Sequence, residues 1–353
     1  MKSIRKPGFS VLFIAICFML LGCNARKIDR KSLVNRHNIN DACLEDILAL
    51  GNGKFCFGVD ATGLQTLGGN IMCDWAWQSY PLPAGATQRD VPETGTIETG
   101  KLEAPMVKAS ANEEVSRWMF RNPHRFTMGR IRFIRTAGDT LSNNEISITE
   151  RELDIWQGIH TTSFRIDKKH DVKVRTVVHP EDDLIAFHIE SEYLGEKGLS
   201  IELSFPYPME KRNRRVNVLW HGHWNLKDRH STIAEIGSQR AIFKRWVDST
   251  QYITTWHWND ANAGLKNLTD DHTYLLTPSG NSIDFICTFG EKEQEKLSAD
   301  YKKIESLTSE SWKEYWNSGG AVDLSESKDE RWKELERRVV LSQYLMKTQS
   351  SGL

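Results

Sequence analysis

Short apolar segments separated by turn residues fill most of the chain after residue 54. The segment 171–179 alternates most clearly, because Val172, Val174 and Val178 would share one face of a strand. Lys173 and Arg175 would lie on the other face, toward water. The predicted strands are 54–60, 129–135, 145–153, 161–166, 171–179, 184–191, 199–205, 241–246, 251–258, 272–277 and 282–289. They predict a mainly β fold, a large antiparallel β-sandwich over residues 37–290.

One stretch inside this region has a different composition. Residues 80–112 are rich in proline, glycine, threonine and glutamate and hold few large apolar side chains. This composition predicts a long surface excursion. Ordered excursions of such length are often functional.

The pattern becomes helical after residue 290. Residues 291–322 predict a helical linker with a short helix over 308–316, and residues 323–353 predict one longer helix. The longer helix has an apolar stripe made of Trp332, Leu335, Val339, Ser342 and Met346. Because terminal helices gain most of their stability from packing, we expect partner helices beyond Leu353. The alternative is a helix that docks back on the sandwich.

The overall composition excludes one class of partner. The 46 Lys and Arg residues balance 47 Asp and Glu residues, so the net charge of −1 provides no field that attracts nucleic acid. The 39% of apolar residues suffices for a sizeable core. Twelve tryptophans are present, and indole rings fill cores but also stack on the C–H faces of sugars.

The N-terminus predicts export. Lys2, Arg5 and Lys6 precede an apolar run over 9–21 that is too short to span a bilayer comfortably. The run ends in Leu-Leu-Gly-Cys at 20–23, which resembles a bacterial lipobox with Cys23 as the acylated residue. We therefore predict a lipoprotein signal peptide over 1–22 and a tether over 23–36. The alternative is an ordinary signal peptide cut nearby.

The residue after the cysteine bears on the location of the protein. Residue 24 is asparagine rather than aspartate, which by resemblance to Gram-negative sorting indicates no retention at the inner membrane. The predicted location is the cell envelope, at the outer membrane, with the N-terminal lipid as the membrane contact.

One cluster is a candidate for sugar contact. Asp74, Trp75 and Trp77 lie just ahead of the excursion. Two flat aromatic rings beside a carboxylate that accepts hydroxyl hydrogens suit a pyranose ring. The alternative is that both tryptophans pack in the core.

Metal and cofactor sites are not predicted. His221 and His223 would share one face of a strand, but no third ligand accompanies them at a telling spacing. The acidic run 181–183 follows a proline and predicts a solvated turn.

Several stretches together resemble the N-terminal portion of the six-hairpin glycosidases, a group that includes the maltose and trehalose phosphorylase family. They are Leu-Gly-Asn-Gly-Lys-Phe at 50–55, Glu-Leu-Asp-Ile-Trp-Gln-Gly at 152–158, Ser-Trp at 311–312 and the run 335–345. The resemblance implies a supersandwich followed by linker helices and the first helix of an (α/α)6 barrel.

The same resemblance implies that the barrel holds the general acid and most of the sugar site. Glycoside cleavage generally uses two carboxylates, and both would lie beyond Leu353, so no catalytic residue is predicted in this chain. The predicted function is the non-catalytic N-terminal part of an envelope-anchored glycoside hydrolase or phosphorylase. The alternatives are a carbohydrate-binding or scaffold lipoprotein, and a purely structural envelope protein.

Overall fold

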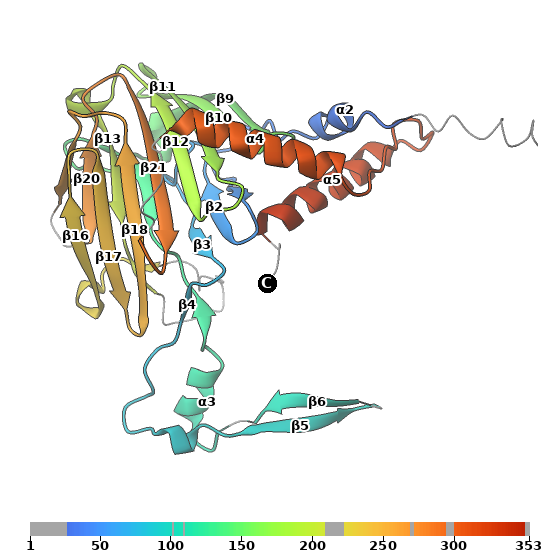
Figure 1. Ribbon diagram of the computed structural model, residues 1–353, viewed down its shortest axis with the longest axis vertical. Coiled ribbons are helices and arrows are strands. Elements are labelled where there is room, and N and C mark those ends of the chain that lie inside the picture. Colours follow the sequence, from blue (N-terminus) through green and yellow to red (C-terminus); the bar gives the residue numbers. More distant parts are fainter. Residues whose placement is uncertain are drawn as a thin grey trace, which may run out of the picture.

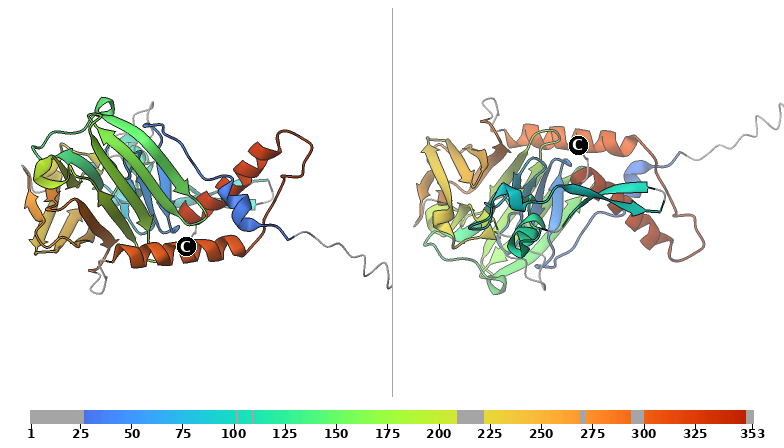
Figure 2. Two further views of the ribbon diagram at one scale, coloured as in Figure 1. Left: turned by 90° about the horizontal axis from the view of Figure 1, so that it is seen from above. Right: turned by 90° about the horizontal axis from the view of Figure 1, so that it is seen from below.

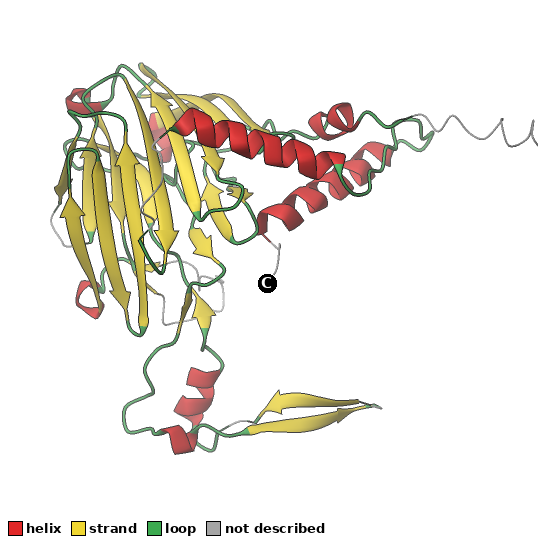
Figure 3. Cartoon of the chain, viewed as in Figure 1, coloured by secondary structure: helices red, strands yellow, loops and turns green. Residues whose placement is uncertain are grey.

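The computed structural model of the protein describes residues 27–100, 102–108, 110–208, 222–268, 272–293 and 300–349. The predicted signal peptide, Cys23 and His221 lie outside these residues. Figure 1 shows a β-sandwich from which two long helices and one thin arm project. Figure 3 shows the same elements by type.

An eight-stranded antiparallel sheet forms one layer of the sandwich. In spatial order its strands are β16 (His230–Ile236), β17 (Arg240–Val247), β18 (Thr250–Trp258), β21 (Ser282–Gly290), β12 (Leu184–Glu190), β11 (His170–Val178), β10 (Ile159–Ile166) and β9 (Ile146–Asp154).

Two smaller antiparallel sheets pack against one face of that layer. The first is β19 (Gly264–Asn267), β20 (Thr273–Thr277), β13 (Leu199–Ser204) and β8 (Arg130–Arg135), and the second is β1 (Leu48–Gly51), β2 (Phe55–Val59) and β3 (Ile71–Cys73). Aromatic pairs join the layers: Phe243 of β17 lies 4.6 Å from Tyr274 of β20, between ring centroids. Phe57 of β2 likewise lies 5.6 Å from Phe187 of β12.

The remaining elements are short. Three two-stranded ribbons are β4 (Trp77–Gln78) with β7 (His124–Arg125), β5 (Thr94–Thr99) with β6 (Leu102–Val107), and β14 (Tyr207–Pro208) with β15 (Gly222–His223). The helices are α2 (Arg30–Asn35), α3 (Glu113–Met119), α4 (Tyr301–Asn317) and α5 (Trp332–Gln349). Single 3-10 turns cover Gln88–Asp90, Asn143–Glu145, Gly195–Lys197 and Lys227–Arg229. Among the described helices, none is both long and apolar enough to cross a membrane.

The predicted fold class is confirmed. Each of the eleven predicted segments coincides with an observed strand to within a few residues. The pattern missed β16, whose Ile233 and Ile236 are exposed, together with β1, β3, β19 and the short ribbons. The predicted domain boundaries at 37, 291 and 323 stay predictions.

The predicted excursion contains an ordered hairpin, β5–β6, and not only loop. The register places Ile97 opposite Ala104 and Thr99 opposite Leu102 on one face of the ribbon, and Met106 lies on that face too. Ile97, Leu102 and Met106 are exposed, Leu102 to 73%. Figures 1 and 2 show this arm projecting on the same side of the sandwich as α5.

Helix α4 covers the outer face of the eight-stranded sheet. Its Tyr301 and Ile304 form a second buried cluster with side chains from β10, β11, β12 and β21. The predicted helix over 308–316 was too short, because Asp300 caps the N-terminus and accepts from the Lys303 amide at 3.1 Å. Thr308 is not a cap, since its hydroxyl donates to the Val178 carbonyl at 2.9 Å.

Helix α5 docks on β1 and β2, the alternative considered above, but through a face that the apolar pattern did not predict. The buried face consists of Glu336, Val340, Tyr344 and Thr348, one residue in every four. Tyr344 donates from its hydroxyl to the Ala49 carbonyl at 2.7 Å. The predicted stripe remains largely uncovered within the described chain: Leu335 is 56% exposed and Met346 is 64% exposed.

Glu336 fixes the start of α5. Its carboxylate is fully buried and accepts from His37 Nε2 at 2.8 Å, from Arg36 at 3.0 Å and from the Leu324 amide at 2.6 Å. A buried carboxylate needs such donors, because desolvation otherwise disfavours its charge. The N-terminal segment is thereby bound to α5.

The substitution Glu336→Ala should lower the free energy of unfolding by about 3 kcal/mol, since it removes the partner of Arg36 and of buried His37. Urea denaturation followed by circular dichroism measures the change. The matched control is Glu334→Ala on the same helix, whose exposed side chain pairs only with Arg337 and Arg338. The control should change stability little, and equal effects of the two substitutions would contradict the assigned role.

Candidate functional site

The predicted sugar-contact cluster lies in the turn between β3 and β4. The turn is held at its start, where the Asp74 amide donates to the Lys54 carbonyl at 2.8 Å. Asp74 and Trp75 are half-buried, whereas Trp77 is 45% exposed. The structure therefore brings Asp74 and Trp75 together and places Trp77 on an outer surface.

Trp75 is held by a carboxylate that the sequence did not connect with it. Its indole Nε1 donates to Asp183 Oδ2 at 2.6 Å. Its ring lies 6.4 Å from the ring of buried Tyr252, between centroids. The predicted solvated turn over 181–183 is thus wrong for Asp183, which is half-buried. No sequence signal links residues 108 positions apart.

The electrostatics of Asp183 reflect both its burial and its neighbours. Burial is the largest effect and raises the pKa of Asp183 above its usual value. The Trp75 hydrogen bond and the nearby Lys54 charge oppose that rise, and the charge of Asp74 adds to it. Asp74, Asp183, Trp75 and Lys54 thus form one polar patch at this edge of the sandwich.

Trp77 contributes a separate aromatic surface. The Arg125 guanidinium carbon lies 5.0 Å from the centroid of the indole ring, in a cation–π contact. The Trp77 carbonyl accepts from the Thr250 hydroxyl at 2.7 Å, which fixes the ribbon to β18. An exposed indole fixed in this way can stack on an apolar sugar face.

The patch lies beside the C-terminal end of α5. The Gly53 amide donates to the Thr348 carbonyl at 2.9 Å, and Asn52 donates to the carbonyls of His179 and Asp182 at 3.0 Å. Lys54 follows directly in the chain. The turn 51–54 therefore connects α5 with the patch.

Metal ligands do not converge in the described part of the chain. No three His, Cys, Asp or Glu side chains there form a group that could hold a metal ion. His223 belongs to β15, and its predicted companion His221 is not described.

A double-mutant cycle tests the Trp75–Asp183 contact. Trp75→Phe and Asp183→Ala should each destabilise the protein, and their effects should be non-additive by about 1 kcal/mol, since either change removes the same charge-assisted hydrogen bond. Chemical denaturation measures all four proteins. Asp182→Ala is the control partner, because the Asp182 carboxylate pairs with His179 and the Trp75 indole donates to Asp183. It should combine additively with Trp75→Phe. Additivity in both cycles would exclude the contact.

Comparison with known proteins shows a fold and no family. No protein-family model matches the sequence, and a search of curated proteins found no match. A solved structure assigned as a kojibiose phosphorylase from the human microbiome matches 89% of this chain at a TM-score of 0.50 and 12% identity. The chain spans only 42% of that protein.

Two further solved structures match less closely. A bacterial glucoamylase complexed with acarbose matches 62% of this chain, with a TM-score of 0.42, 9% identity and 36% of its own length covered. An inverting mannosidase of family GH92 from Bacteroides thetaiotaomicron matches 90%, with a TM-score of 0.39, 10% identity and 40% of its own length covered. The chain thus shares the fold of a part of the phosphorylase-like protein: a β-sandwich followed by helices.

Proposed function

We propose that the chain is the non-catalytic N-terminal part of an envelope-anchored glycoside hydrolase or related phosphorylase, with catalysis in an (α/α)6 domain that continues α5. The observation that carries this proposal is the uncovered apolar side of α5, formed by Leu335, Leu345 and Met346. An amphipathic helix in a globular protein normally buries such a side. Further helices packed on it would do so.

The projecting arm supports the same arrangement. A two-stranded hairpin is marginally stable by itself, so the apolar face of β5–β6 needs a neighbour. In Figure 1 the C-terminal end of α5 lies between the sandwich, α4 and this arm. A helical domain that follows α5 would contact both uncovered faces.

In this arrangement the polar patch would form one wall of the substrate site. Because the turn 51–54 links Thr348 to the patch, a domain that follows α5 begins beside Asp74 and Trp75. Asp74, Trp75 and Trp77 are our proposed substrate contacts. The general acid and its partner belong to the helical domain, as glycoside cleavage needs two placed carboxylates.

The enzyme assay compares two lengths of chain. The 353-residue chain should release no glucose from kojibiose, maltose or trehalose, in buffer or in phosphate. A polypeptide extended by the coding sequence that follows codon 353 should cleave one of them. Cleavage by the 353-residue chain would place catalysis within it, and a stop codon directly after codon 353 would contradict the proposal.

The runner-up function, sugar binding without cleavage, is favoured by the exposed Trp77–Arg125 surface. This function predicts different results for the same two lengths of chain. The 353-residue chain would bind a disaccharide in calorimetry, Trp77→Ala would abolish binding, and the extended polypeptide would cleave nothing.

We also propose that the protein is exported and held at the outer membrane by a lipid on Cys23, because the first 23 residues resemble a lipoprotein signal. Cys23→Ala should abolish incorporation of radiolabelled palmitate in expressing cells. Cys43→Ala is the matched control, since Cys43 is an exposed free thiol of the described chain, and it should leave labelling unchanged. Labelling that persists in Cys23→Ala would contradict the assignment.

A further inference from the structure

The N-terminal segment is fastened to the C-terminal end of α4. Arg30 donates to the carbonyls of Trp316, Ser318 and Gly319 at 2.8, 2.9 and 2.8 Å. The last carbonyls of a helix lack partners within it and carry partial negative charge, so a guanidinium is a favourable partner for them. Helix α2 is therefore fixed where α4 ends.

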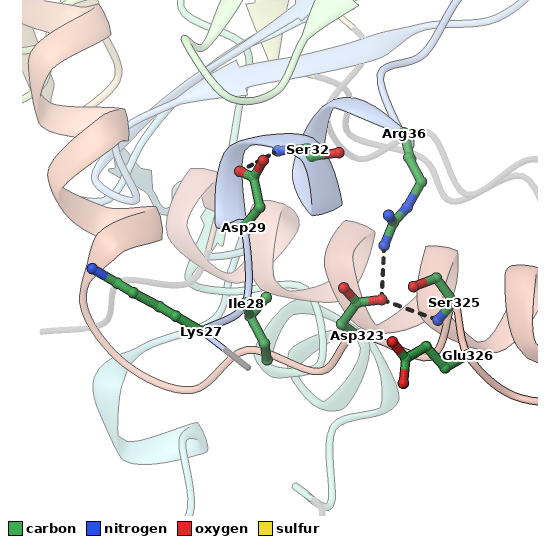
Figure 4. A pocket seen from close by; sticks show the side chains of 8 residues that line it. All are labelled: Lys27, Ile28, Asp29, Ser32, Arg36, Asp323, Ser325 and Glu326. Carbon is green, nitrogen blue, oxygen red and sulfur yellow. Dashed lines mark hydrogen bonds and ion pairs between the residues drawn. The ribbon is translucent and has the colours of Figure 1, made fainter. Parts of the chain in front are cut away.

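The same segment is fastened to the start of α5. Arg36 and His37 bind buried Glu336, and Arg36 also pairs with Asp323 at 3.0 Å. We name residues 318–331, which join α4 to α5, the elbow. Figure 4 shows Arg36, Asp323 and Ser325 around a cavity of about 330 Å³, with Lys27 and Ile28 at its edge. Lys27 thus lies beside the elbow.

Chain length limits the distance from this point to the lipid. Three residues separate Cys23 from Lys27, and an extended chain covers at most about 14 Å over the four residue steps between them. A diacyl-type anchor holds its cysteine at the boundary of the lipid headgroups. A tether this short cannot let the docked segment move far from the bilayer.

We infer that the elbow is the membrane-facing surface of the anchored protein and lies against the lipid headgroups. The inference rests on the proposed anchor at Cys23 and adds the orientation of the protein relative to the bilayer. Figures 1 and 2 show the elbow and the β16–β17 edge at opposite ends of the molecule, so that edge points away from the bilayer. The 18 residues of α5 span about 27 Å, and they separate the elbow from the turn 51–54.

The charge of the elbow indicates that the tether, and not surface attraction, sets this orientation. Its exposed charged residues are mixed in sign: Asp323, Glu326, Asp329 and Glu330 accompany Lys328 and Arg331. A surface that binds anionic lipids by itself has a cluster of basic residues. Because acidic residues outnumber basic ones here, zwitterionic headgroups fit this elbow better than anionic ones.

Energy transfer to a lipid dye tests the orientation. The lipidated protein, in a Cys43→Ser background, is labelled with a fluorophore at Val322→Cys in the elbow or at Ser238→Cys between β16 and β17. Both positions are exposed. In phosphatidylcholine and phosphatidylethanolamine vesicles with a rhodamine headgroup lipid, transfer from position 322 should exceed transfer from 238 several-fold. Equal transfer, or stronger transfer from 238, would overturn the inference.

Two variants test whether the short tether and the contacts of Arg30 set the orientation. Insertion of about 20 Gly and Ser residues between Arg26 and Lys27 frees the tether and should remove the difference between the positions. Arg30→Ala should reduce the difference, while the control Lys31→Ala, an exposed neighbour in α2, should not. A difference that stays unchanged in the insertion variant and in Arg30→Ala would show that the tether does not set the orientation.

A second preparation separates this inference from the anchor itself. The mature chain from Asn24, with an N-terminal hexahistidine, is attached to vesicles that contain a nickel-chelating lipid. If mass spectrometry finds no acyl chain on Cys23, the proposed anchor is wrong. In that case the probes at 322 and 238 on the hexahistidine-anchored protein still measure whether attachment through the N-terminus holds the elbow at the vesicle surface. Equal transfer here would overturn the geometry whatever the state of Cys23.

Discussion

The positions of α4 and α5 depend on Gly51 and Gly158, because each helix packs so closely on the sandwich there that a Cβ atom would not fit. A Cβ atom on Gly51 would overlap with the Thr348 carbonyl oxygen of α5, and one on Gly158, at a φ of +69°, would overlap with the Trp312 ring of α4. Both helices therefore approach the backbone of the sandwich directly. Trp312 and Tyr344 then stack on each other at 4.8 Å, between ring centroids, and close the gap between the helices.

The same positions lie in the stretches that resemble the six-hairpin glycosidases. Gly51 and Gly53 belong to the run 50–55, Gly158 ends the run 152–158, and Trp312 belongs to the third stretch. These short stretches are the ones at which the helices meet the sandwich. The glycines at 51 and 158 are required there by close contact with the Thr348 carbonyl and the Trp312 ring.

The strands could be predicted from the sequence, because a sheet with one buried face imposes a period of two on its side chains. The docked face of α5 could not. Glu336, Tyr344 and Thr348 are polar, and they are buried because each has a hydrogen-bond partner. The partners of Glu336 and Tyr344 lie at distant points of the chain, whereas the Thr348 hydroxyl donates to the Tyr344 carbonyl one turn earlier in α5. Hydrophobic periodicity instead marks Leu335 and Met346, which the described chain leaves exposed. Asp183 was missed for a similar reason: its partner Trp75 is adjacent only after folding.

The contacts of α4 and α5 also bear on movement. Tyr315 donates to the Gln343 carbonyl, Trp316 donates to the Ile155 carbonyl, and Tyr344 donates to the Ala49 carbonyl, so each helix is bonded to the sandwich and α4 is bonded to α5. Such bracing leaves no hinge between the β layers and the helices. The described sandwich and helices should behave as one cooperative unit, and any large movement would fall to the slender β5–β6 arm rather than to a swing of whole domains.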